Sequence, residues 1–347
     1  MREADFRSDT KTRPNAAMRK AMAEAEVGDD VAGEDPSVNR LEAMAAERLG
    51  KEAAVYVTSG TQGNLVALLA HCQRGDEVIL GDTSHIVKGE GGGPMVLGGI
   101  VITTLPVDNR GMLDPDQVDS AVHTDGTNYP RTRLVALENT HNASGGVPLT
   151  PEDMKSVADV AHGHGLPVHV DGARLFNASV ALETPVAELV KDIDSVTFCL
   201  SKGLGAPVGS VLCGSNEFID EARRWRRMLG SGMRQAGVIA AAGIVALDTM
   251  VDRLAEDHSN ARRLSTGLAE IPGIAIDPDA LPTNLVFFTM KYSNHDEIAR
   301  RIIDQGVLLG ARGGGYCRMA THADVTGDDV EYALDVISST ITEYGKN

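Results

Sequence analysis

The stretch His169-Val170-Asp171-Gly172-Ala173-Arg174, together with Ser201-Lys202-Gly203-Leu204-Gly205 further along the chain, decides the fold class. Asp171 follows the β-branched run 167–170, and Lys202 follows a second such run, 195–200. Both runs have the composition of short buried strands. The sequence therefore places a carboxylate at the end of one buried strand and an amine at the end of the next.

This pairing suits the cofactor pyridoxal phosphate (PLP). The aldehyde of PLP needs an amine with which it forms a Schiff base, and its pyridine nitrogen needs an acid that keeps it protonated, so that the ring can accept electrons. Taken singly, Asp171 is more often a turn or helix cap, and Ser-Lys-Gly is a weak pattern. The remainder of the chain has to supply the rest of such a site.

Composition and charge fit a soluble α/β enzyme. A chain of 347 residues can bury a large core in about two domains, and the formal net charge of −17 argues against nucleic acid or anionic membranes as partners. No signal peptide opens the sequence and no apolar run reaches membrane-spanning length, which predicts a cytoplasmic protein. Cys199 and Cys213 fall in apolar runs, so we expect buried free thiols rather than disulfides or zinc ligands.

Strands and helices alternate along most of the chain, which predicts a mostly parallel sheet covered by helices. The polar segment 6–14 reads, on composition alone, as an exposed arm, and the arginine-rich helix over 216–229 as a solvated or intersubunit face. The pattern changes to a smaller α+β arrangement near residue 252. We therefore predict an N-terminal arm and large PLP-binding domain over 1–251, and a small C-terminal domain over 252–347.

Two further places can bind a ligand. The turn Ser59-Gly60-Thr61-Gln62-Gly63-Asn64 follows a strand and opens a helix, whose free N–H groups and positive dipole end can hold a phosphate. An ordinary Ser/Thr helix cap explains the same residues. His85 comes just after the strand-like run 77–82, at the edge where α/β sheets bind ligands, although it can equally cap a turn.

These motifs together resemble those of the low-specificity L-threonine aldolases, PLP enzymes of the aspartate-aminotransferase fold (fold type I). Each motif is weak alone, but their order and spacing are specific, and the resemblance runs nearly end to end. It is carried by the segments 6–10, 28–30, 59–64, 84–85, 137–141, 169–174, 201–203 and 232–235, with Arg318 and His322.

The resemblance implies a role for each cofactor-binding residue. Lys202 would carry PLP, Asp171 would pair with the pyridine nitrogen, and His85 would stack on the ring. Ser59, Gly60 and Thr61 would hold the phosphate. A further phosphate contact would come from Arg234, within one subunit or across a subunit boundary.

The resemblance also implies how the substrate binds. Arg174 and Arg318, with Ser8, would bind the substrate carboxylate, because a guanidinium matches its geometry in a bidentate way. The β-hydroxyl proton would leave through His85, or through a water held by His85 and Glu90. Several family members have a second active-site histidine where this chain has Asn128, so the preference between threonine and allo-threonine stays open.

The predicted reaction is retro-aldol cleavage of L-threonine, L-allo-threonine and related L-β-hydroxy-α-amino acids to glycine and an aldehyde, with no metal site assigned. Two other interpretations stand beside it: another fold-type-I reaction, such as β-elimination or transamination, and a non-catalytic PLP-binding protein. By resemblance, we expect a homotetramer with active sites at the dimer interface.

Overall fold

The computed structural model describes residues 2–124, 127–278 and 283–345. The chain forms two compact units, one of Pro14–Val251 and one of Met1–Arg13 with Asp252–Asn347. The first thirteen residues therefore belong with the smaller unit, whereas the sequence prediction placed them in the large domain. None of the described helices is long and apolar enough to cross a membrane.

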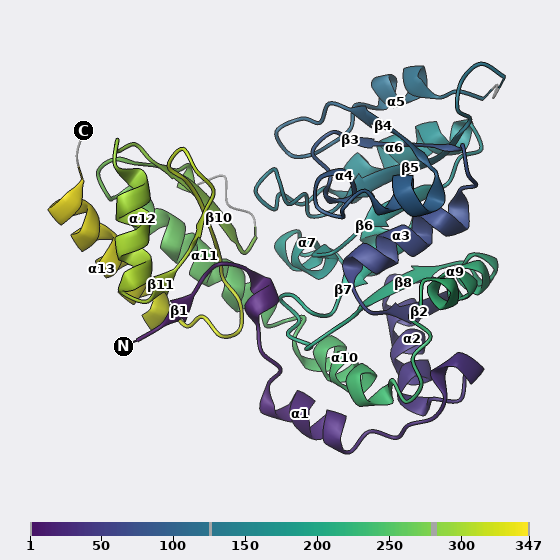
Figure 1. Ribbon diagram of the computed structural model, residues 1–347, viewed down its shortest axis with the longest axis horizontal. Coiled ribbons are helices and arrows are strands. Elements are labelled where there is room, and N and C mark those ends of the chain that lie inside the picture. The colour runs from purple at the N-terminus through teal and green to yellow at the C-terminus, as the bar shows by residue number, and fades with distance from the viewer. Residues whose placement is uncertain (1, 125–126, 279–282, 346–347) are drawn as a thin grey trace. The chain divides into compact units, whose positions relative to one another are not determined.

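A seven-stranded sheet forms the centre of the larger unit (Figure 1). Within this sheet only β8 runs against its neighbours, as judged from the described strands, so the predicted mostly parallel sheet is confirmed. The strand order is β2 (Ala53–Val57), β8 (Ser210–Gly214), β7 (Ser195–Cys199), β6 (Val168–Asp171), β5 (Thr132–Glu138), β3 (Glu77–Gly81) and β4 (Val101–Leu105).

Helices cover the sheet because the strands are apolar on both faces. On one face, α3 and α9 pack against alternate residues of β2, β3, β5 and β8 (Figure 1). Helix α2 packs against β2, and α6 against β5 and β6. The helices of this unit are α1 (Ala16–Ala23), α2 (Pro36–Leu49), α3 (Gly60–His71), α4 (His85–Lys88), α5 (Pro115–Ala121), α6 (Pro151–Gly163), α7 (Leu175–Ala181), α8 (Val186–Leu189), α9 (Asn216–Met228) and α10 (Gly237–Thr249).

The arginine-rich helix α9 is not simply a solvated face. Arg226 is buried and pairs with the buried Asp30 at 3.0 Å, and Arg223 pairs with Glu42. Burial raises the pKa of Asp30, although the charge of Arg226 opposes that rise. The prediction for this helix is therefore wrong for Arg226, whose charge holds the 28–30 loop against the unit.

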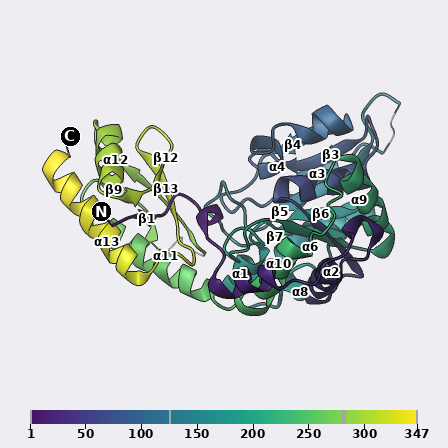
Figure 2. The same cartoon turned by 60° about the horizontal axis from the view of Figure 1, so that its bottom comes forward.

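The smaller unit is an α+β structure with its own core. An antiparallel sheet of order β12-β13-β10-β9 packs with α11 and α13, which lie side by side in Figure 2. The elements are α11 (Leu254–Ala269), β9 (Ile274–Ala275), β10 (Leu285–Met290), α12 (His295–Asp304), β11 (Val307–Leu308), β12 (Gly310–Ala311), β13 (Tyr316–Ala320) and α13 (Gly327–Tyr344).

The N-terminal segment is a packed part of this smaller unit. Strand β1 (Ala4–Asp5) pairs in parallel with β11, and Phe6 and Asp9 are fully buried. The composition-based prediction of an exposed arm is therefore wrong, because strand pairing across the whole chain length has no local signal. All four cysteines are free and buried, which confirms the prediction for Cys199 and Cys213.

Candidate active site

The predicted cofactor residues of the larger unit meet at the carboxyl edge of the sheet. In the strand register, Glu138 at the end of β5 pairs with Asp171 at the end of β6, and Asp171 pairs with Thr197 of β7. Lys202 follows the end of β7. His85 follows β3, which runs parallel to β5. Parallel strands end at the same edge, so the register alone brings these side chains to one side of the sheet.

The 59–64 turn lies at the same edge because β2 is parallel in direction to β7, with β8 between them. Ser59 caps α3 by accepting the backbone N–H of Gln62 at 3.1 Å. A Cβ built on Gly60 would lie 2.8 Å from the Cys199 sulfur, closer than real Cβ contacts come. Only glycine lets the N-terminus of α3 pack this closely against the end of β7, just before Lys202.

A polar cluster of the partly exposed His85 and the buried Glu90 and Asp171 lies at the same edge as Lys202. His85 Nδ1 lies 3.0 Å from Glu90 Oε1, and ligand atoms of His85, Glu90 and Asp171 lie within 4.8 Å of one another. The Asn64 amide donates to Glu90 Oε1 at 2.9 Å and to Asp171 Oδ2 at 2.8 Å. That spacing would also suit a metal ion, but N–H groups directed at both carboxylates stabilise their negative charge in place of a cation.

The electrostatics of the cluster are those of crowded carboxylates. Burial raises the pKa of Glu90 and the charge of Asp171 adds to that rise, while the hydrogen bonds with His85 and Asn64 oppose it only in part. The hydrogen bond with Glu90 raises the pKa of His85, against the opposing effect of burial. The His85–Glu90 pair therefore holds a proton to higher pH than either group would alone.

Glu138 supports the loops around the cluster. Its carboxylate accepts the backbone N–H of His85 at 2.7 Å and that of Asn142 at 2.8 Å. Burial, and next the charge of Asp171, raises the pKa of Glu138 to about 7. Arg174 is buried and donates to the Asn142 side chain at 3.3 Å. Glu138 thus fixes the loops that carry His85 and, through Asn142, the Arg174 guanidinium.

The other predicted substrate residues, Ser8 and Arg318, lie in the smaller unit. Arg318 Nη2 donates to the carbonyl of Arg7 at 2.9 Å, next to Ser8 in the chain. Ser8 caps the short helix Asp9–Lys11. The structure therefore brings Arg318 to the segment that contains Ser8.

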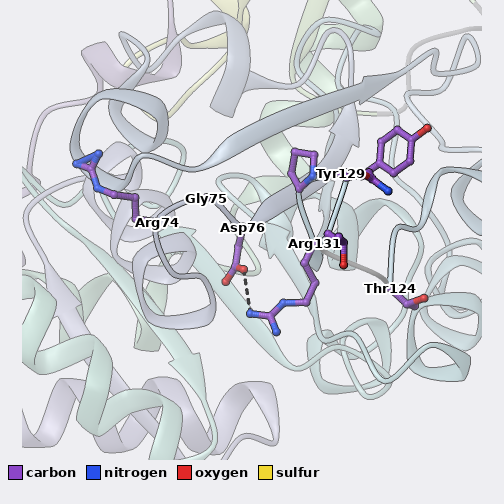
Figure 3. A pocket seen from close by; sticks show the side chains of 9 residues that line it. Arg74, Gly75, Asp76, Thr124, Tyr129 and Arg131 are labelled. Atoms are coloured by element: carbon purple, nitrogen blue, oxygen red, sulfur yellow. Dashed lines mark hydrogen bonds and ion pairs between the residues drawn. The ribbon is translucent and has the colours of Figure 1, made fainter.

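One predicted site residue, Asn128, lies away from the cluster in its own chain. Asn128 lines a hollow of about 600 Å³ with Arg74, Asp76 and Arg131 (Figure 3), at the amino edge of β3 and β5. The seven residues of β5 separate this edge from Glu138 by about 20 Å, at about 3.3 Å per residue. Arg234 is exposed and pairs with Asp29 at 2.8 Å.

The sequence did not single out Asn64 or Glu138 as functional. Asn64 is the last residue of the quoted 59–64 motif, but it lies on an apolar helix, where a single polar residue gives no indication of its partner. Glu138 ends a buried strand in the same position as Asp171 ends the next one. The signal available in the sequence was a charged residue at the end of an apolar strand. This signal applied equally to Glu138 and Asp171.

Comparison with known proteins gives the family and the fold of this chain. A family model described as beta-eliminating lyase matches residues 5–291. The solved structure of Leishmania major threonine aldolase superimposes with a TM-score of 0.82 at 21% identity, covering 97% of this chain and 99% of that one. The chain is thus a lyase-family enzyme with the predicted fold type I.

Two relatives identify the family within this broader group of lyases. Low-specificity L-threonine aldolase 1 of Arabidopsis thaliana is 46% identical over 340 residues, covering 96% of this chain and 95% of the plant protein. The low specificity L-threonine aldolase of Escherichia coli (strain K12) is 45% identical, with 93% and 94% covered. The chain belongs to the low-specificity L-threonine aldolase family, as the motifs predicted.

Proposed function

We propose that this enzyme cleaves the Cα–Cβ bond of L-threonine, L-allo-threonine and related L-β-hydroxy-α-amino acids to give glycine and an aldehyde, with PLP as cofactor. The observation that carries the proposal is the His85–Glu90–Asp171 cluster, with both carboxylates buried, at the carboxyl edge that also carries Lys202. Its residues are those to which the resemblance of the sequence motifs assigns these roles.

The residues present fit PLP. Among the described residues, the Lys202 amine has no hydrogen-bond or ion-pair partner, so it is free to react. Glu90 Oε2 is buried with no protein partner among the described side chains, which leaves an acceptor for a ligand. Lys202 would hold the cofactor, Asp171 would pair with its nitrogen, His85 would lie against its ring, and Ser59, Gly60 and Thr61 would hold its phosphate.

When bound, PLP supplies the electron sink that accepts the electron pair of the broken Cα–Cβ bond. The chain's own residues supply orientation and proton transfer. Arg174, whose position is fixed through Asn142, would bind the substrate carboxylate. The family resemblance implies the same ligand for Ser8 and Arg318. Binding that carboxylate decides which Cα bond is presented for cleavage.

The His85–Glu90 pair would take the proton of the β-hydroxyl group, either directly or through a water. The 3.0 Å hydrogen bond lets Glu90 stabilise the charge that His85 gains when it accepts that proton. A proton must also return to Cα before glycine leaves, so the protons balance over one turnover. Transamination and β-elimination need no base at the β-hydroxyl, and the pair therefore favours aldol cleavage over both.

The oligomeric assembly is a further proposal, supported by the family resemblance and by the position of Asn128 at the far edge of the sheet. We propose a homotetramer in which Asn128 and Arg234 contribute to the site of a neighbouring subunit. Mixing Lys202→Ala and Arg234→Ala subunits should restore activity if Arg234 acts across an interface, since some sites then contain both native residues. If both variants are inactive alone and mixing restores no activity, Arg234 acts within its own chain; if Arg234→Ala alone is fully active, Arg234 has no role. The cytoplasmic location stays a prediction of the sequence.

The proposed function is tested by acetaldehyde release from the four threonine stereoisomers, with purified protein supplied with PLP. Release from L-threonine, L-allo-threonine or both, and from neither D isomer, is the expected result. Keto-acid formation from alanine or serine without acetaldehyde would favour transamination or β-elimination. A cofactor spectrum that no amino acid perturbs would indicate a non-catalytic PLP-binding protein.

A further inference from the structure

Asn64 is at the centre of a buried hydrogen-bond chain that no predicted role explains. Its side chain is 1% exposed and contacts both carboxylates of the cluster through Nδ2. Its Oδ1 lies 3.2 Å from His169 Nε2. His169 Nδ1 lies 2.9 Å from Ser195 Oγ, which lies 2.8 Å from His71 Nε2. The chain therefore runs from His71 to Asp171 through four hydrogen bonds.

The direction of every hydrogen bond in this chain is fixed by chemistry. Carboxylates accept, so the Asn64 amide must direct its two N–H groups at Asp171 and Glu90 and its oxygen at His169. Burial lowers the pKa of His169 to about 3, so its ring is neutral. A neutral ring with its proton on Nε2 has a bare Nδ1, which accepts the Ser195 hydroxyl proton.

The outer part of the chain follows in the same way. Ser195 has used its only proton, so its oxygen accepts from His71 Nε2. Burial also lowers the pKa of His71, to about 4, and the ring stacks on Phe218 at 4.4 Å. All donors therefore point from His71 toward the carboxylates. Aligned hydrogen bonds polarise one another, which strengthens the two N–H donors of Asn64.

The chain also connects the elements that carry the site. Asn64 and His71 are on α3, whose first turn contains the predicted phosphate contacts. His169 is on β6, two residues before Asp171, and Ser195 opens β7, which leads to Lys202. One polar chain thus ties together the three elements that hold the cofactor residues.

We infer that Asn64 is a positioning residue: its amide, oriented by His169, Ser195 and His71, holds the Asp171 carboxylate in place for the cofactor nitrogen and keeps Glu90 in place beside His85. This inference rests on the proposed function, because it assigns Asp171 to the cofactor. It adds four hydrogen-bonded residues that support the contact between Asp171 and the cofactor nitrogen. None of these four residues is assigned a contact with the substrate.

The test measures the PLP dissociation constant and the absorbance spectrum of the bound cofactor against pH. Asn64→Leu removes both donors and keeps the number and branching of the side-chain heavy atoms, although leucine is the larger residue. We expect the dissociation constant to rise about tenfold or more, as two charge-assisted hydrogen bonds are lost. We also expect the absorbance change to move to higher pH, because a less firmly protonated ring nitrogen leaves the Lys202 nitrogen more basic.

Two variants of His169 separate orientation from bulk. Glutamine can place an N–H near the position of Nε2, whereas leucine cannot donate. His169→Leu should therefore change the cofactor affinity and spectrum in the same direction as Asn64→Leu, and His169→Gln should lie closer to the wild type. This pair also decides the question if Asn64→Leu fails to fold.

The matched control is Thr132→Val. It removes a buried hydroxyl that donates to the Glu77 carboxylate at 2.6 Å, on the opposite edge of the same sheet. It should lower the melting temperature and leave the cofactor spectrum unchanged. The contrary outcome is that Asn64→Leu and His169→Leu behave like Thr132→Val, with stability reduced but cofactor affinity and spectrum unchanged. In that case the hydrogen-bond chain is only structural and the inference is wrong.

The two proposals fail in different ways. If the wild-type protein binds PLP but releases no acetaldehyde, while the Asn64 and His169 variants still shift the spectrum, the proposed function fails and the role of Asn64 stands. If the wild-type protein cleaves threonine and the variants bind PLP as it does, the proposed function stands and the role of Asn64 fails.

Discussion

The two edges of the large sheet contain the same kinds of groups, a lysine and a histidine–glutamate pair, in opposite states. At the amino edge, Glu77 accepts hydrogen bonds from Thr103, Thr132 and His123 at 2.5, 2.6 and 3.1 Å. Lys51 at that edge donates to two backbone carbonyls, those of Val190 and Ile193. Each of these polar groups is matched by protein partners.

At the carboxyl edge the matching is incomplete. Glu90 is bonded to His85 and Asn64 through one oxygen, and its other oxygen is buried without a partner among the described residues. Lys202 has no polar partner there either, within the same described set. The histidines are similarly exposed, at 39% for the His85 side chain and 36% for that of His123. The edges therefore differ in hydrogen bonding, and only slightly in access to water.

The pKa values of the two glutamates differ in direction for this reason. Burial would raise the pKa of Glu77, but the hydrogen bonds from Thr103, Thr132 and His123 lower it overall. Burial raises the pKa of Glu90, and its hydrogen bonds with His85 and Asn64 do not cancel the effect. A carboxylate with all its acceptors occupied stabilises the fold, whereas one left short of donors is available for chemistry.

The comparison predicts its largest difference for the two lysines. Lys202→Ala should abolish threonine cleavage, by at least about 10³-fold, and remove the absorbance of the bound cofactor, because it removes the amine assigned to the Schiff base. Lys51→Met should keep both and lower the melting temperature. Acetaldehyde release and the ultraviolet–visible spectrum of the two variants, measured together, give the answer. If Lys202→Ala retains activity, the assignment of Lys202 as the residue that carries PLP is wrong.

A smaller effect is expected where α3 meets the end of β7. Gly60→Ala places a Cβ against the Cys199 sulfur, and overpacking of this kind costs about 1–3 kcal/mol. PLP affinity should fall about tenfold as the helix N-terminus moves, and Cys199→Ala in the same chain should restore much of it. Gly163→Ala is the control, because a Cβ at that position would have no atom within 4 Å. Equal affinity for all three variants would show that the turn does not hold the phosphate.

The smallest predicted effect is a shift in pH dependence. An ordinary histidine has a pKa of about 6.5. The pKa of His85 is raised above that value, so its ring stays protonated to higher pH. If neutral His85 accepts the hydroxyl proton, kcat/KM should rise with pH through that raised value. Glu90→Gln should move this limb to lower pH, since it weakens the hydrogen bond that raises the pKa, while Glu77→Gln should leave it in place. If Glu90→Gln does not move the rise of kcat/KM with pH, that rise belongs to a group other than His85.

The same pKa shift has a defined sign for stability. A histidine with a raised pKa in the folded state stabilises the fold below its unfolded value, and this contribution is lost as the pH rises through the folded value. The lowered pKa of Glu77 acts in the opposite sense. Its contribution is present above the unfolded carboxyl value and is lost as the pH falls through the folded one.

Much of the carboxyl edge was predictable from the sequence. Asp171, Lys202, His85 and the 59–64 turn each follow a recognisable strand, and the parallel register brings strand ends together without further information. Side-chain partners were not predictable in this way. The two carboxylates that Asn64 contacts come from residues 26 and 107 positions away, and nothing local in an apolar helix indicates them.

The same limit explains the predictions that were wrong. An arginine-rich helix has the sequence pattern of a solvated face, and the burial of Arg226 depends on Asp30, far away in the chain. The N-terminal segment appears too polar to pack, and its strand pairs with β11 near the other end of the chain. Local periodicity predicts elements, but it does not identify the distant partner that satisfies a charge or a strand edge.

The most direct test of the account compares Glu90→Gln with Glu77→Gln, measuring threonine turnover and melting temperature for both. Glu90→Gln should lower kcat by about 10²-fold or more, in the range of a general acid–base group, and leave the melting temperature unchanged or higher. Glu77→Gln should keep turnover within about twofold and lose about 1–3 kcal/mol of stability, as its charge-assisted hydrogen bonds weaken. Turnover that survives Glu90→Gln, or is lost with Glu77→Gln, would contradict the assignment of chemistry to the carboxyl edge.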